Sequence, residues 1–82
     1  MMRNVIGPRV RQARIAHRPR LTQDALAAAL QLRGIQLDRS AISKLERQQR
    51  AVTDLELVAL AAVLEVSSGW LLGEAHSPNG TE

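Results

Sequence analysis

Cysteine is absent from the 82 residues, and aromatic side chains are nearly so, because Trp70 stands alone with no Phe or Tyr. Without cysteine, neither a disulfide framework nor a Cys-ligated metal site can form, and the composition suits a reducing compartment such as the cytoplasm. The interior must then be filled by Leu, Ile, Val and Ala, which suit closely packed helices better than a sheet. We therefore expect a single small all-α domain.

Long apolar runs are lacking as well. The longest uncharged one, Leu57–Leu64, lies between Glu56 and Glu65 and is far shorter than the roughly 20 residues that span a bilayer. The N-terminal segment has no apolar run typical of a secretory signal. Its first 23 residues are Arg-rich and free of acid, as in a transit peptide, but they fit the first helix of a packed domain better. We expect no membrane partner and a cytoplasmic location.

Basic residues are missing from the second part of the chain. Residues 1–50 contain all 11 basic residues and three acidic ones, a net charge of +8, whereas residues 51–82 contain five acidic residues, a net charge of −5. Ten of the 11 basic residues are Arg, whose planar guanidinium suits phosphate and guanine. This asymmetry favours a polyanion as the partner of the first part, although a solvated basic surface would have the same composition.

Helix signals recur along the chain, with Pro and Gly at the joints. Thr22 and Asp38 are good N-caps, Thr53 with Glu56 has the spacing of a capping box, and Ser67 is expected to start a short fifth helix. Pro8 fits a first helical turn, and Gly34 and Gly73 fit helix ends. The expected helices run from Gly7 to His17, from Thr22 to about Arg33, from Arg39 to about Gln48 after Asp38, from Thr53 through Leu64, and from Ser67 to Gly73.

The third expected helix has two distinct faces. Ala41, Ile42 and Leu45 form its apolar face. The remaining polar residues recur at spacings of three and four, so they share one stripe: Arg39, Ser40, Ser43, Lys44 and Arg47.

Segments of the chain resemble the Cro/repressor (XRE-type) helix-turn-helix domain. They are Leu21–Ala27, Arg39–Glu46 and Val66–Leu72, within a resemblance that extends from Ile6 to Gly73. The resemblance implies a five-helix, lambda-repressor-like fold in which the second and third helices form the motif. The third helix would lie in the major groove of double-stranded DNA, and the second would cross the backbone.

The resemblance also implies roles for single residues. It aligns Arg39, Ser40, Ser43 and Lys44 with base-contacting positions, although an ammonium such as that of Lys44 suits a phosphate equally well. It aligns Gln23 with a residue that holds a phosphate and braces the recognition helix. It also pairs Arg14 with Glu46 inside the domain; the alternative is that Arg14 contacts DNA. Further phosphate contacts are expected from Arg33, Arg47 and Arg50.

The chain departs from the family pattern at two links. The segment from Gln31 to Leu37 is about five residues longer than the usual tight turn of the motif. An insertion near Arg18 and Pro19 lengthens the preceding link. The longer turn either extends the second helix or forms a loop, and either would change how the third helix sits in the groove.

We expect a sequence-specific regulator, a repressor that binds a near-palindromic operator as a homodimer. The alternative is an antitoxin or adaptor whose main role is to bind a protein. Trp70, Leu71 and Leu72 are either core or dimer contacts. No catalytic residue, metal site or cofactor is expected, because Ser40 and Ser43 lack a neighbouring base and the histidines are isolated. The domain is expected to cover residues 1–74, with a disordered tail at 75–82.

Overall fold

The fold is built from helices alone over residues 1–78, the part of the chain that the computed structural model describes. Their order and bounds are α1 Gly7–Ala16, α2 Gln23–Leu32, α3 Arg39–Glu46, α4 Asp54–Leu64 and α5 Ser68–Leu71. The expected all-α fold with five helices is confirmed. α3 ends two residues before the predicted Gln48, because Arg47 caps the helix and Gln48 takes the left-handed conformation with φ of 63°.

Side chains begin four of these helices as predicted. Each N-cap oxygen accepts a hydrogen bond from the backbone N–H three residues on, at 2.8–3.1 Å, in Thr22, Asp38, Thr53 and Ser67. The carboxylate of Glu56 accepts in return from the Thr53 N–H at 3.0 Å, which completes the capping box. These bonds satisfy N–H groups that have no partner within their own helix.

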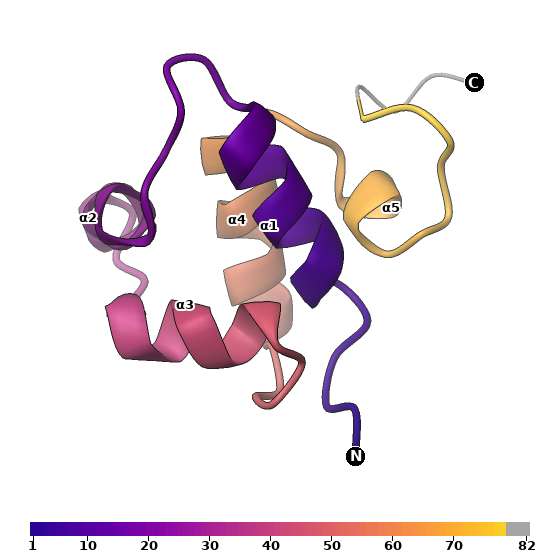
Figure 1. Ribbon diagram of the computed structural model, residues 1–82, viewed down its shortest axis with the longest axis horizontal. Coiled ribbons are helices and arrows are strands. Elements are labelled where there is room, and N and C mark those ends of the chain that lie inside the picture. Colours follow the sequence, from indigo (N-terminus) through magenta and orange to yellow (C-terminus); the bar gives the residue numbers. More distant parts are fainter. Residues whose placement is uncertain (79–82) are drawn as a thin grey trace.

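The core lies where α1 and α2 both pack on α3 and α4, with α5 against α4 on the other side of α1 (Figure 1). Aliphatic side chains fill it, as the composition predicts. The fully buried ones are Val10, Leu26, Leu30, Leu37, Ile42, Leu45, Leu60 and Leu71. Every helix contributes to this list, so the position of α3 is fixed from behind by the whole domain.

Gly7 allows α1 to approach the end of α3 closely. A Cβ built on Gly7 would lie 2.4 Å from the Leu45 carbonyl oxygen and 2.8 Å from that of Glu46. No larger residue fits there without moving backbone. The Gly7 N–H instead donates to the Asn4 side-chain oxygen at 2.8 Å, so Asn4 serves the start of α1.

The two lengthened links take defined conformations. Between α2 and α3, residues 33–38 form a loop, in which Gly34 has φ of +80° and Leu37 is fully buried. Between α1 and α2, residues 17–22 are held by Leu21, whose N–H donates to the Arg14 carbonyl at 3.3 Å. The longer turn of the motif is therefore a loop and does not extend α2.

Part of the expected tail contacts the domain. Ala75 packs on the core, and the Pro78 carbonyl accepts a hydrogen bond from the Ser67 N–H at 2.7 Å. The rest of that prediction, over residues 79–82, lies outside the described residues. Within residues 1–78, no helix is both long and apolar enough to cross a bilayer.

Candidate DNA interface

The predicted polar stripe lies on the outer side of α3. Arg39, Ser40, Lys44 and Arg47 are exposed and Ser43 is half-buried, whereas Ile42, Leu45 and Glu46 on the opposite side are buried. The loop at residues 33–38 leaves the stripe uncovered, because 70% of the Arg39 side chain remains accessible beside it. The geometry thus presents a helix face of cationic and hydroxyl groups that a DNA groove can receive.

A buried ion pair holds α3 to α1. Arg14 donates from Nε to Glu46 Oε2 at 2.7 Å and from Nη2 to Oε1 at 3.0 Å, with side-chain exposures of 11% and 4%. Arg14 also donates from Nη1 to the Leu21 carbonyl at 3.1 Å. The guanidinium is fully engaged inside the domain, and the bidentate geometry fixes the two helices in rotation as well as in distance.

Gln23 joins α2 to the same pair. Its Nε2 donates to Glu46 Oε1 at 3.1 Å, so one carboxylate receives bonds from both α1 and α2. Gln23 stands at the first position of α2, where helical N–H groups lack partners inside the helix. The side chain braces α3 through Glu46 and leaves that end of α2 partly accessible.

Asp24 and Arg39 connect the first turns of α2 and α3. Their closest charged atoms, Arg39 Nη1 and Asp24 Oδ2, are 3.9 Å apart, and about 70% of each side chain is exposed. An exposed pair at this separation contributes little to stability, so Arg39 can exchange Asp24 for a DNA group at small cost.

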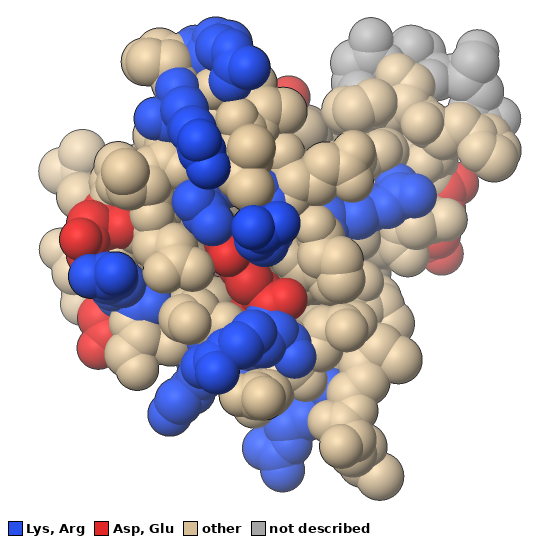
Figure 2. Space-filling model, viewed as in Figure 1, with Lys and Arg blue, Asp and Glu red and all other residues tan. Residues whose placement is uncertain are grey.

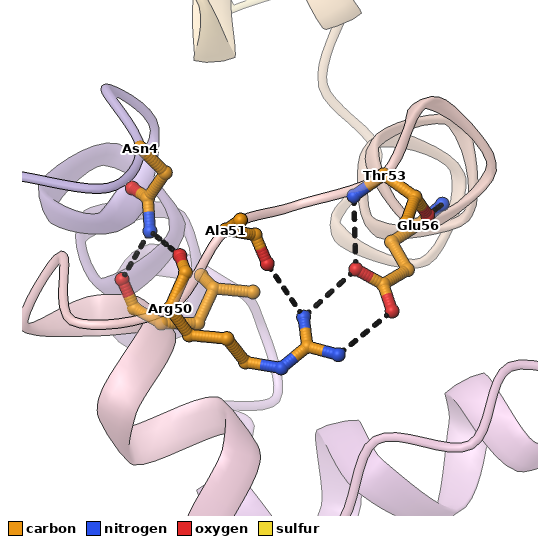
Figure 3. A network of polar contacts seen from close by, with 6 residues as sticks. Asn4, Arg50, Ala51, Thr53 and Glu56 are labelled. Atoms are coloured by element: carbon orange, nitrogen blue, oxygen red, sulfur yellow. Dashed lines mark hydrogen bonds and ion pairs between the residues drawn. The ribbon is translucent and has the colours of Figure 1, made fainter.

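Arg50 is engaged inside the domain (Figure 3). It donates to Glu56 Oε1 at 2.8 Å and Oε2 at 3.0 Å, and to the Ala51 carbonyl at 2.8 Å. The hydrogen bonds from Arg50 lower the pKa of Glu56, against the opposing effect of burial, and the same contact raises the pKa of Arg50. This pair holds the turn after α3 to the start of α4.

The other two cations expected to bind phosphates occupy different places. Arg47, just after α3, is exposed and donates from Nε to the Ser43 carbonyl at 3.3 Å. Arg33 caps the far end of α2 and lines a hollow with Leu55 and Val58 of α4. α2 is ten residues long, so Arg33 is separated from the Gln23 end by roughly 15 Å along the helix.

Trp70 and Leu71 belong to the core of the domain. Trp70 is 5% exposed and Leu71 is fully buried, whereas Leu72 is 40% exposed. Arg9 holds the indole in place: its guanidinium carbon lies 4.9 Å from the ring centroid, and its Nη1 donates to the Trp70 carbonyl at 2.7 Å. Cation–π contacts of this kind stabilise a buried ring. Among these three side chains, Leu72 is the one with substantial accessible surface for a partner.

Asn4 is a structural residue that sequence reasoning missed. Its Nδ2 donates to the Leu45 carbonyl at 3.0 Å and the Arg50 carbonyl at 2.8 Å (Figure 3). Gln48 returns a bond from Nε2 to the Asn4 carbonyl at 3.1 Å. His17, one of the histidines that are isolated in the sequence, has its Nε2 3.0 Å from Glu65 Oε2. These contacts join segments far apart in the chain, so no local pattern announces them.

Lys and Arg side chains gather on the face that carries the motif. In Figure 2 they form a broken band from the α1–α2 link at the top, past α2, to α3 and the N-terminal segment at the bottom. The acidic side chains on this face are fewer and lie mostly beside basic ones. Such a distribution suits a ligand with a regular row of negative charges.

The fold and the exposed stripe of α3 together define a helix-turn-helix nucleic-acid-binding domain. The sequence model of the helix-turn-helix family matches residues 10–71, so the chain belongs to the Cro/repressor (XRE-type) helix-turn-helix family of DNA-binding transcription regulators. Comparisons with curated proteins and with solved structures give no match.

Proposed function

We propose that the protein is a repressor that recognises a specific operator by inserting α3 into the major groove. The observation that carries the proposal is the division of α3 into a buried apolar side and an exposed side bearing Arg39, Ser40, Ser43, Lys44 and Arg47. A protein seated in the groove over a promoter excludes polymerase from it. Repression is therefore the regulatory outcome that we assign.

Each side chain of the stripe has a role that fits its chemistry. Arg39 donates two hydrogen bonds to guanine O6 and N7, an interaction that discriminates against other bases by about 1–3 kcal/mol. Ser40 and Ser43 bond to base edges. Lys44 and Arg47 reach the groove wall, where phosphate contacts position the protein without reading sequence.

Gln23 is the last of the proposed DNA contacts, and Arg50 and Arg33 are not among them. Gln23 holds a phosphate while it braces Glu46. Arg50 stays with Glu56 and acts in stability, because a phosphate would have to compete with two charge-assisted hydrogen bonds. Arg33 lies beside side chains of α4, so we assign it no DNA contact.

The operator is a near-palindrome because the protein binds it as a homodimer. Two copies related by a two-fold axis place their recognition helices about 34 Å apart, in successive major grooves. Leu72 borders an apolar hollow with Val5, Val52 and Leu57, and we assign the dimer contact to this surface.

Selection of bound genomic fragments followed by anisotropy titration tests the recognition role of α3. We expect Arg39→Ala to bring the affinity for the selected site close to that for arbitrary DNA. Lys44→Ala should weaken both duplexes by the same factor, because it removes only a phosphate contact. An equal loss on both duplexes for Arg39→Ala would remove Arg39 from base reading.

A protein-binding module, as in an antitoxin or adaptor, is the second candidate. It is favoured by exposed apolar side chains away from the stripe: Leu32, Leu55 and Val58 are 91%, 72% and 62% exposed. A defined partner whose capture is lost in Leu55→Glu, while DNA binding persists, would support it. Retention of the partner by Leu55→Glu would count against this surface.

A further inference from the structure

Two cationic hollows flank α3. One lies between the start of α2 and that of α3, with Arg20, Gln23, Asp24 and Arg39 in its lining. The other lies between α3 and the N-terminal segment, with Arg3, Ala41, Lys44 and Arg50 in its lining. At 3.6 residues per turn, Arg39 and Ala41 point about 160° apart around the helix, so the hollows lie on opposite flanks of the stripe.

Lys44, which already has a proposed phosphate contact, lines the second hollow, and the further uncommitted cations are Arg20 in the first hollow and Arg3 in the second. Both are exposed, and neither guanidinium has a hydrogen bond or ion pair within residues 1–78. The acidic groups nearby are both occupied: Asp24 lies 3.9 Å from Arg39, and Asp38 accepts from the Ala41 N–H at 2.8 Å. An anion entering either hollow would therefore meet a free Arg and one carboxylate: Asp38, which caps α3, or Asp24, which loses Arg39 when that residue contacts a base.

The backbone beneath each of these arginines is fixed relative to the motif. Next to Arg20, Leu21 donates from its N–H to the Arg14 carbonyl at 3.3 Å and accepts from Arg14 Nη1 at 3.1 Å. The Arg3 N–H donates to the Gln48 carbonyl at 2.9 Å, beside the two bonds that tie Asn4 to the end of α3. Both side chains thus start from anchored positions on either side of α3.

We propose that Arg20 and Arg3 each hold a phosphate, on the two opposite walls of the major groove that α3 enters. A helix with its side chains is about 10–12 Å wide and the groove is about 12 Å wide, so both flanks face sugar–phosphate backbone. The inference rests on the proposed insertion of α3. It adds a phosphate clamp formed by Arg20 and Arg3. Arg3 lies outside the family match at residues 10–71.

The salt dependence of binding to a short duplex of arbitrary sequence tests the clamp. Each lost phosphate contact makes the slope of log affinity against log salt shallower by about 0.9. We expect that change for Arg20→Ala and for Arg3→Ala, and twice that change for the double variant. Arg20→Lys and Arg3→Lys should keep the slope of the unaltered protein, because a phosphate contact needs only the charge.

Arg18→Ala is the matched control, since it removes the same charge two residues from Arg20. Arg18 donates from Nη1 to the Ile15 and His17 carbonyls at 3.0 Å and lines a separate hollow beside Glu65. Its slope should stay unchanged. An equal change in Arg18→Ala would reduce the effect to net charge and overturn the clamp.

Methylphosphonate substitution of single phosphates in a selected operator separates the two walls. Within each half-site, Arg20→Ala and Arg3→Ala should each abolish interference at one phosphate, on opposite strands. Slopes unchanged in both variants, or a shared phosphate, would overturn the clamp, whereas a loss of specificity in Arg39→Ala would still support insertion of α3. Absence of duplex binding by the unaltered protein would overturn the proposed function and the clamp together.

Discussion

Arg14 and Glu46 carry opposite charges that are almost completely buried. Removing either residue leaves the other charge unpaired, which lowers the stability of the fold. Arg14→Ala would strand a carboxylate with 4% exposure, and only Gln23 would still bond to it. Breaking a buried pair in this way costs about 3–5 kcal/mol. We expect urea denaturation to show a loss of that size in the free energy of unfolding.

Two further variants make that measurement specific. Arg20→Ala removes an exposed guanidinium six residues away and should change the free energy of unfolding by no more than about 0.5 kcal/mol. Replacing both members, as Arg14→Met with Glu46→Leu, should cost less than Arg14→Ala alone, because no charge is then left buried. A stability of Arg14→Ala equal to that of Arg20→Ala would contradict a structural role for the pair.

At the scale of elements, the joint between α3 and α4 depends on the ionisation of Glu56. Hydrogen bonds from Arg50 lower its pKa in the folded state, so the contact contributes fully above the ordinary glutamate pKa of 4.5 and is lost as the pH falls through the lower folded pKa. Glu56→Gln keeps a capping-box side chain but loses the ion pair. We expect it to be less stable at pH 7 by about 1 kcal/mol.

The pH dependence of thermal unfolding checks this expectation. The unaltered protein should lose its advantage over Glu56→Gln as the pH falls below about 4.5, and the two unfolding curves should approach each other in acid. A constant difference in melting temperature between the two proteins from pH 7 down to pH 3 would disprove that the ionisation of Glu56 stabilises the joint between α3 and α4.

Elements whose signals are local were predictable from the sequence. The N-caps at Thr22, Asp38, Thr53 and Ser67 each act on a residue three positions on, so spacing alone located the helix starts. The α3 stripe follows from helical period. The partners of Asn4 do not, because its bonds span 41 and 46 residues and depend on how the N-terminal segment meets the end of α3. The pairing of Arg50 with Glu56, six residues on, depends on the turn between α3 and α4. For the same reason, spacing could not decide whether Trp70 is core or interface.

At the scale of the molecule, the sequence separates basic from acidic residues along the chain. The basic residues of the first 50 positions surround the motif (Figure 2), whereas α4 and the segment after it carry acid and exposed apolar side chains. A dimer joined through the hollow of Leu72, which is lined by residues of both parts, keeps both α3 stripes free for DNA. Joining through the α3 stripes would place like charges together.

Leu72 tests this arrangement. It is 40% exposed beside the core, and in a two-fold interface one substitution acts twice because both copies present the same patch. We expect Leu72→Glu to give the mass of a monomer in multi-angle light scattering, and to bind a full operator no more tightly than a half-site.

Leu55→Glu is the control, since it places the same charge on an apolar position outside the hollow of Leu72 and should leave the dimer intact. A dimeric Leu72→Glu that keeps its preference for the full operator would move the interface elsewhere, and loss of the dimer in Leu55→Glu alone would assign it to the outer face of α4.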